Sequence, residues 1–527
     1  MQEDNGASYE IRKGKESGNS LARSSMVVSS LTFFSRILGL VREIVFAGLF
    51  GDSAQADTFF VAFRIPNFLR RLFAEGAFSQ AFVPVLSEYK QKRSFTEIKE
   101  LVDHVAGRLS STLILVSIFG VIGAPILAML FAPGYINDGE KFSLLVEMLR
   151  ITFPYILLIS LTGFAGSILN SYGRFAVPAI TPVFLNISLI VCAIWLSPLF
   201  AEPVIAIAWG LIAAGVIQLM FQLPFLGHLK LIPQPRLRPK HEGVSRVITL
   251  MIPVMFSVSV GQLNLLLDTV LATSIEGDGS VSWLYYADRI MYLPLGIFAV
   301  AIATVILPSL SRKHADESVD NFKGTLDWGL RCIVLVALPA TIALITLAEP
   351  MVITIYQRGE FSADSVLPTA RALQAYALGL LAFMSIKVLA SAYFARQDTK
   401  TPVRYGIIAM VCNIVMNLLL ITPLAHIGLA LATAFSSWVN AGLLLFGLMK
   451  LKLFNFHRRF FVMVLKVIFA NLLMFTFLLG FNETADKWLN WSTLARSGNL
   501  AFLCLGGGFC YILGLLIAGI RLRDFKH

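Results

Sequence analysis

The chain has 527 residues, of which 57% are hydrophobic and only 14% are charged, and its mean hydropathy is +0.75. Soluble domains carry about a quarter charged residues, so this composition excludes an ordinary soluble protein and predicts an integral membrane protein. The formal net charge of +11 is spread over short loops rather than gathered on a soluble face, so we expect no nucleic-acid partner.

The predicted elements begin after a polar, basic segment. Residues 1–24 contain no apolar core or cleavage site of a signal peptide, and we expect them to form a cytoplasmic tail. Apolar stretches of about twenty residues, long enough to cross a bilayer, follow one another to the end of the chain and predict about fourteen transmembrane helices. They lie near residues 25–50, 57–86, 106–132, 145–171, 176–197, 203–226, 245–274, 281–310, 325–347, 365–394, 402–423, 427–450, 460–480 and 498–520.

The loops between these spans alternate in charge. Those after the second, sixth, eighth, tenth and twelfth spans are basic, and the odd-numbered loops are acidic or neutral. Because cytoplasmic loops carry an excess of Lys and Arg, the alternation predicts a multi-pass protein with both termini in the cytoplasm. A miscounted span would invert the pattern from that point onwards, and the pattern is not inverted.

Two landmarks recur at a common displacement. The run AFSQAFVPVLS around Pro84 resembles AIATVILPSLS around Pro308, and the polar turn before Pro178 matches that before Pro402; both intervals are 224 residues. This predicts a duplicated unit of six helices. Six is an even number, so the two copies enter the membrane in the same direction and the repeats are parallel.

The predicted fold is therefore all-α, with two parallel six-helix lobes and two further C-terminal helices. We expect the substrate to lie between the lobes. The predicted parts are the tail at 1–24, an N-lobe at 25–226, a cytoplasmic linker at 227–244, a C-lobe at 245–452, and the last two helices with a cytoplasmic C-terminus at 453–527.

Ionisable residues gather in the first two spans and at corresponding places in the second lobe, although each costs at least about 2.5–3.5 kcal/mol at mid-membrane. Ion pairs such as Arg71 with Glu75, or snorkelling to the headgroups, explain single residues but not the whole set, which has three excess positive charges. Arginine forks suit phosphate and carboxylate, so we expect an anionic, lipid-linked substrate such as a pyrophosphate. The basic residues are Arg36, Arg42, Arg64, Arg70, Arg71, Arg289 and Lys387, and the acidic residues are Glu43, Glu75, Asp268 and Asp288.

Motifs for catalysis or cofactor binding are absent from the sequence. The seven histidines are scattered, the five cysteines lie in apolar segments without metal-ligand spacing, and there is no GxxxxGK[ST] phosphate loop. No loop is long enough for a soluble catalytic domain. We therefore expect no enzyme activity, cofactor or metal, and a driving force other than ATP. Glu43 and Asp268, which are 225 residues apart, are candidate sites for ion or proton coupling.

The run SSLTFFSRILGLVREIVFAGLFG, followed by ADTFFVAFRIPNFLRRLFAEGAFSQAFVPVLSEY, closely resembles the signature of the MurJ (MviN) family of bacterial lipid II flippases. SVSWLYYADRIMYLP at 280–294 and ARQDTKTPV at 395–403 are similar to further family motifs. The resemblance extends from about residue 21 to the C-terminus. It implies the fold of the multidrug/oligosaccharidyl-lipid/polysaccharide (MOP) exporters, with MATE-like lobes, and alternating-access transport of lipid II to the outer leaflet of the bacterial cytoplasmic (inner) membrane for cell wall synthesis.

The resemblance also implies roles for single residues, carried over by motif position. The implied substrate-binding residues of the cavity are Arg36, Arg42, Arg70, Arg71, Arg289, Lys387, Asp57 and Glu75. The last two helices are implied to shape a groove for the polyprenyl tail. The implied partners are lipid II, which is undecaprenyl-pyrophosphate-linked disaccharide-pentapeptide, membrane lipids, and proteins of cell-wall synthesis or division.

Four other functions are open to a membrane protein of this size. A MATE-like, cation-coupled multidrug exporter would favour an acidic cavity, which the excess of arginine opposes. A flippase for another polyprenyl-pyrophosphate-linked oligosaccharide is compatible with the charges. A membrane glycosyltransferase would need catalytic carboxylates or a metal motif near an aqueous face, and a structural scaffold would not need seven buried cations.

Overall fold

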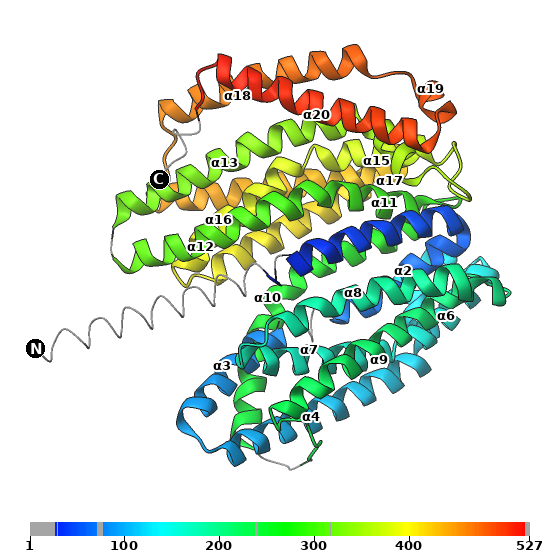
Figure 1. Ribbon diagram of the computed structural model, residues 1–527, viewed down its shortest axis with the longest axis vertical. Helices are drawn as coiled ribbons and strands as arrows, with labels where there is room; N and C mark the ends of the chain where they lie inside the picture. Colours follow the sequence, from blue (N-terminus) through cyan, green and yellow to red (C-terminus); the bar gives the residue numbers. More distant parts are fainter. Residues whose placement is uncertain (1–26, 29, 71–76, 238–240, 317, 522–527) are drawn as a thin grey trace, which may run out of the picture. The chain divides into compact units, whose positions relative to one another are not determined.

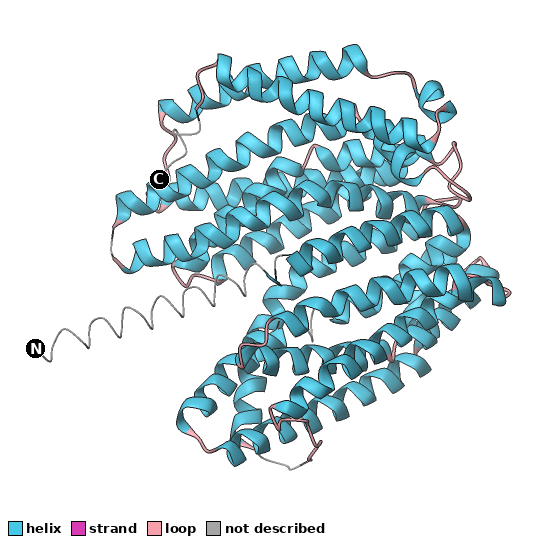
Figure 2. Cartoon of the chain, viewed as in Figure 1, coloured by secondary structure: helices cyan, strands magenta, loops and turns pink. Residues whose placement is uncertain are grey.

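The structure, a computed structural model, describes residues 27–28, 30–70, 77–237, 241–316 and 318–521 (Figure 1). These residues form helices joined by short loops, and they contain no strand (Figure 2), which confirms the predicted all-α class. The predicted tail at 1–24 lies outside them.

Ten ranges within the described residues are long and apolar enough to cross a membrane. One of them, Lys400–Lys450, contains two of the predicted spans, so the ten ranges account for eleven. The three other predicted spans, near 25–50, 57–86 and 245–274, are helical in their described parts. The architecture is therefore consistent with the predicted fourteen.

Contacts divide the chain into two compact units. The first unit consists of the chain up to Phe46, Val61–Leu130 and Asp138–Ser259. The second consists of Ala47–Phe60, Phe131–Asn137 and the chain from Val260 onwards. These boundaries follow contacts, whereas the predicted lobes follow the sequence repeat, and the lobe boundaries stay a prediction. Three unit boundaries, after Phe46, Phe60 and Ser259, fall in the interior of continuous helices, and a fourth, after Leu130, separates only the last residue of a short helix.

The first unit begins with a helix through residues 30–50, of which the last four belong to the second unit. The helices α2 (Ala54–Arg70) and α10 (Glu242–Thr273) also contribute to both units. The other helices of the first unit are α3 (Ala77–Lys92), α4 (Phe95–Ile122), α5 (Ala124–Phe131), α6 (Gly139–Thr152), α7 (Tyr155–Ser171), α8 (Ala176–Val191) and α9 (Ile205–His228).

The core of the first unit lies where α3, α4, α7 and α9 meet. Phe78 and Phe82, one helical turn apart on α3, stack with ring centroids 5.3 Å apart, and Phe164 of α7 meets both rings edge-on. In a bilayer the lipid tails are as apolar as these side chains, so close van der Waals packing, rather than the hydrophobic effect, holds such helices together.

The segment after α9 is fastened to α4 within the first unit. The buried carboxylate of Asp103 accepts the backbone N–H of Gln234 at 2.8 Å, and its backbone carbonyl accepts the N–H of Arg236 at 3.1 Å. A Cβ atom at Gly107 would lie 2.2 Å from the carbonyl oxygen of Arg236, so only glycine permits this approach. The described part of the predicted linker is thus hydrogen-bonded to α4 and packs against it.

The second unit contains α11 to α20. Its helices are α11 (Ser280–Pro294), α12 (Val300–Ala315), α13 (Val319–Thr346), α14 (Ala348–Tyr356), α15 (Val366–Ala377), α16 (Leu380–Ala395), α17 (Lys400–Lys450), α18 (Arg458–Phe481), α19 (Ala485–Asn490) and α20 (Thr493–Ile517). Single turns of 3₁₀- or π-helix, η2 (Pro133–Tyr135), η3 (Cys192–Leu196), η4 (Ser197–Leu199) and η5 (Leu295–Ala299), adjoin the longer helices of both units.

A sharp reversal divides α17 into its two predicted spans. Ala425 has φ 48° and ψ −130°, two residues after Pro423. Beyond the bend, a Cβ at Gly428 would lie 2.4 Å from the carbonyl oxygen of Leu420, so the two arms approach closely. This confirms the predicted division between 402–423 and 427–450, and it brings side chains of the two arms together.

Candidate functional site

A buried ion pair lies in the first unit on the helix through residues 30–50. Arg42 is 8% exposed and Glu43 is 3% exposed, and the Nη2 of Arg42 forms an ion pair with the Glu43 carboxylate. The Nη1 of Arg42 donates to Oδ1 of Asn186 on α8 at 3.1 Å, and the guanidinium lies 5.8 Å from the ring centroid of Phe46. Burial of both charges is tolerable because each is paired and hydrogen-bonded.

Arg36 lies on the same helix, but its side chain is exposed. The helix therefore carries two arginines that differ in solvent exposure. Arg36 is accessible, whereas Arg42 is held in place by contacts from two helices.

Asp57 lies in the first turn of α2 and belongs to the second unit, where its carboxylate is 3% exposed. It accepts the backbone N–H groups of Gly279 and Ser282, each at 2.8 Å, and the Ser282 hydroxyl at 2.5 Å. Gly279 is the N-cap of α11 and offers no side-chain cap, so Asp57 supplies the missing acceptor from a distant part of the chain.

These contacts give Asp57 a capping role at the start of α11, and its predicted role in substrate binding stays a prediction. The neighbouring Asp52 makes a similar link, because it accepts the Trp283 indole N–H at 2.6 Å and the Ser365 hydroxyl at 2.8 Å. The Ala47–Phe60 segment is therefore tied to the second unit through two carboxylates.

We expect Asp57→Asn to lower the free energy of unfolding by about 1–3 kcal/mol, because one acceptor oxygen becomes an NH₂ group facing a buried N–H donor. Thermal unfolding of the purified protein in detergent measures the change. Asp138→Asn is the matched control, since Asp138 caps α6 through one bond to the Lys141 N–H and is partly exposed. Equal Tm values for the two variants would contradict the capping role.

Arg289 lies on α11, and its guanidinium carbon is 4.7 Å from the ring centroid of Tyr285. Tyr285 in turn stacks on Phe60, with ring centroids 3.9 Å apart and an interplanar angle of 20°. A guanidinium over an aromatic face is stabilised by about 0.5–1 kcal/mol or more and has its orientation restricted. The half-buried Arg289 therefore lies over the Tyr285 ring, which is itself stacked on Phe60.

Asp268 on α10 lies among neutral polar groups of α17. Its carboxylate accepts Nδ2 of Asn417 at 2.7 Å and the hydroxyl of Thr433 at 2.9 Å. The amide of Asn413 lies 3.2 Å from Thr433 Oγ1 and 2.9 Å from the Asn417 amide. Because Thr433 follows the bend at Ala425 and the asparagines precede it, the reversal of α17 builds this cluster.

The other predicted site residues are distributed as follows. Lys387 is exposed on α16 in the second unit. Arg70 ends α2, but its side chain lies outside the described residues, as do Arg71 and Glu75. Among the described residues, no group of three or more His, Cys, Asp or Glu could hold a metal ion.

Sequence reasoning missed the neutral residues Asn186, Asn413, Asn417 and Thr433. Asn413 and Asn417 are four residues apart in an apolar span and therefore lie on one helix face, a signal that could have indicated a polar cluster. The sequence offers no comparable signal for Asn186, whose partner Arg42 is 144 residues away.

A family model described as "Lipid II flippase MurJ" matches residues 46–497. The chain is 45% identical over 513 residues to a probable lipid II flippase MurJ of Vibrio cholerae serotype O1, covering 96% of this chain and 98% of the relative. It is 43% identical over 434 residues to a lipid II flippase MurJ of Burkholderia cenocepacia, covering 82% of this chain and 84% of that one.

Two solved structures are similar over most of the chain. A lipid II flippase MurJ in an inward closed conformation has a TM-score of 0.79 and 29% identity, and the match covers 95% of this chain and 99% of that one. An inward-facing MATE family transporter of the MOP superfamily has a TM-score of 0.68 at 17% identity, covering 81% and 98%. The second likeness concerns the fold alone.

Proposed function

This chain belongs to the MurJ family of lipid II flippases, and from that membership we propose that it moves lipid II from the inner to the outer leaflet of the bacterial cytoplasmic membrane. The identity of 45% over nearly the full length of a probable lipid II flippase carries this proposal. Its family consists of transporters, and we propose no catalytic activity for the chain.

We propose that the pyrophosphate of lipid II binds to arginines of the predicted cavity. Guanidinium forks give bidentate, charge-assisted hydrogen bonds to phosphate oxygens. Arg36 is accessible, Arg289 has its orientation restricted by Tyr285, and Arg42 is held by Glu43 and Asn186. Arg70, Arg71, Lys387, Asp57 and Glu75 complete the proposed set.

Transport is proposed to proceed by alternating access. Three boundaries between the compact units fall in the interior of continuous helices, namely the helix through 30–50, α2 and α10. A relative movement of the units must therefore bend helices rather than slide loops. Pro66 lies in α2 six residues beyond its boundary, and proline removes a hydrogen bond of the helix ladder and favours such a bend.

The polyprenyl tail is proposed to lie along the last two long helices. A pocket of about 260 Å³ lies between α13 and α18, and most of its lining is apolar. Leu338 and Ile342 of α13 face Ile468, Leu472 and Phe475 of α18 there. Branched hydrocarbon with no hydrogen-bonding group matches this lining.

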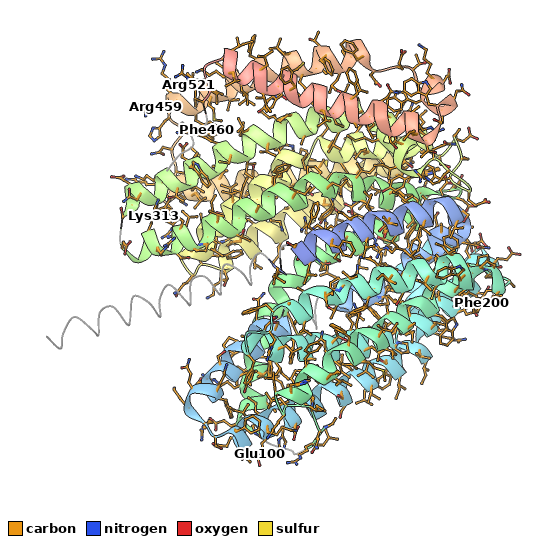
Figure 3. All side chains as sticks on the ribbon, in the orientation of Figure 1. Glu100, Phe200, Lys313, Arg459, Phe460 and Arg521 are labelled. Carbon is orange, nitrogen blue, oxygen red and sulfur yellow. The ribbon has the colours of Figure 1, made fainter. Side chains whose placement is uncertain are left out.

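We propose that both termini are cytoplasmic and that lipid II is handed to proteins of cell-wall synthesis or division. The described basic residues Lys313, Arg459 and Arg521 support this topology. They lie at the left-hand end of the helices of the second unit in Figure 3, the end that the loop charges assign to the cytoplasm.

Glu43 and Asp268 are the two carboxylates proposed for ion or proton coupling. Glu43 forms an ion pair with Arg42, and Asp268 accepts hydrogen bonds from Asn417 and Thr433. One charge moving through 100 mV is worth about 2.3 kcal/mol, enough to bias a two-state carrier.

Asp268→Asn should uncouple flipping from its driving force, because the amide keeps the size of the side chain but removes the charge. In proteoliposomes the wild-type rate should respond to an imposed potential or cation gradient, and the rate of the variant should not. Asp486→Asn, at the exposed helix α19, is the control and should respond as wild type does. A variant that keeps the full response would exclude Asp268 as the coupling site.

The decisive test of the function is depletion of the protein in growing cells. Lipid II in the outer leaflet is measured by its accessibility to an impermeant enzyme that cleaves it, and it should fall on depletion and recover on re-expression. Appearance of lipid II in the outer leaflet at the normal rate would refute the proposal. If depletion removes another polyprenyl-linked oligosaccharide from the outer leaflet and leaves lipid II there, the alternative substrate is favoured.

A further inference from the structure

Asn186 is a buried amide in the apolar helix α8, 6% exposed, whose two ends meet different partners in the first unit. Its Oδ1 accepts Nη1 of Arg42 at 3.1 Å, and its Nδ2 donates to the backbone carbonyl of Ser35 at 3.0 Å. Turning the amide over would place NH₂ against a guanidinium and oxygen against a carbonyl, so the two contacts fix its orientation.

Both contacts reach one helix at points seven residues apart, which is two helical turns. A buried amide needs hydrogen bonds to be tolerated, and the Ser35 carbonyl satisfies its donor. The acceptor end is satisfied by a cation. The Nη1 of Arg42 is thereby held by the neutral Asn186 on α8, and its Nη2 is held by the carboxylate of the adjacent Glu43.

The second repeat shows a contrasting arrangement. Asp268 follows Glu43 by 225 residues, and the residue at the same interval from Arg42 is Leu267. Asp268 accepts a hydrogen bond from Asn417 directly, whereas Glu43 and Asn186 are linked through the guanidinium of Arg42, which contacts both.

We propose that Asn186 is a positioning residue for Arg42. Its Oδ1 stays hydrogen-bonded to Nη1 of Arg42. At the same time Nη2 releases the Glu43 carboxylate and binds a pyrophosphate oxygen of lipid II. This inference rests on the proposed function, in which Arg42 binds the pyrophosphate. Carboxylate and phosphate offer a guanidinium the same pair of acceptor oxygens, so one can replace the other without moving the fork.

The advantage of such an arrangement is preorganisation. A free arginine side chain samples many rotamers and must be ordered when a ligand binds. An arginine already fixed on one edge needs no such ordering. Loss of the fixed edge is expected to weaken lipid II binding about three- to tenfold, the range that corresponds to immobilising one long side chain.

The test measures binding of lipid II, with its undecaprenyl chain, to the purified full-length chain in detergent. Asn186→Leu removes both contacts at similar volume, and Asn186→Ala is the second variant; each should raise the Kd three- to tenfold. Gln218→Leu is the matched control. Gln218 is a buried amide of α9 that donates to an uncharged partner, the Thr181 carbonyl of α8, at 2.8 Å, so the Kd of this variant should stay within twofold of wild type.

A double-mutant comparison separates positioning from general packing. In an Arg42→Lys background, where the planar fork is gone, Asn186→Leu should change the Kd by less than twofold. The same fold-change in both backgrounds would mean that Asn186 acts through packing alone and would overturn the proposal. Thermal unfolding of every variant identifies any that are misfolded.

Glu43→Gln tests the exchange with Asn186 intact, so the proposal stays testable even when the Asn186 variants fail to fold. Removal of the competing carboxylate should tighten lipid II binding at least threefold, and an unchanged or weaker Kd would overturn the exchange. If Arg42→Ala leaves the Kd unchanged, the proposed role of Arg42 is wrong; if Arg42→Ala weakens binding but Asn186→Leu matches Gln218→Leu, only the positioning role is wrong.

Discussion

Arg42→Ala is expected to abolish flipping and complementation of a depleted strain, with a loss of about 100-fold or more. Truncating one member of a buried, hydrogen-bonded charge pair costs about 2–5 kcal/mol, and the variant also removes a proposed pyrophosphate ligand. Flipping in proteoliposomes and growth of the depleted strain measure the effect. The protein should still insert into the membrane.

Two controls make this result interpretable. Arg93→Ala removes an exposed arginine that pairs with Glu97 at 3.1 Å, and it should leave flipping unchanged. The double variant Arg42→Ala/Glu43→Gln removes the carboxylate left without its cation, so it should recover thermal stability but not transport. Recovery of transport in the double variant would show that Arg42 serves only to neutralise Glu43.

Arg289→Ala is expected to lower the flipping rate by a factor similar to that of Arg42→Ala, for a different reason. Arg289 rests on the Tyr285 ring, so its removal deletes a proposed pyrophosphate ligand that an aromatic ring orients. Arg289→Lys keeps the charge but not the planar fork and should retain partial activity. Arg459→Ala, in the exposed first turn of α18, is the matched control. Full flipping by Arg289→Ala would remove Arg289 from the cavity.

Much of the fold could be predicted from the sequence because its signals are local. Apolar length predicts spans, and the division of α17 at Ala425 falls between the predicted spans 402–423 and 427–450. The gathering of arginines was equally visible. A membrane imposes a high cost on each of them, which makes composition informative about function.

The partners of these charges could not be predicted because they are distant in the sequence. Adjacent side chains leave a helix about 100° apart, yet the long Arg42 side chain reaches its neighbour Glu43. Asn186 and Asn417 are 144 and 149 residues from the charges that they bind. A neutral amide in an apolar span gives no indication of which distant helix it will meet.

The contacts of Asp57 also limit when this part of the protein can complete its folding during synthesis. Its partner Gly279 lies 222 residues further along the chain, so Asp57 leaves the ribosome long before the N–H groups that will bind it. At about 5–20 residues per second, the interval is about 10–45 s. During that time water must satisfy the carboxylate, because its contacts with Gly279 and Ser282 form only after the start of α11 has been synthesised.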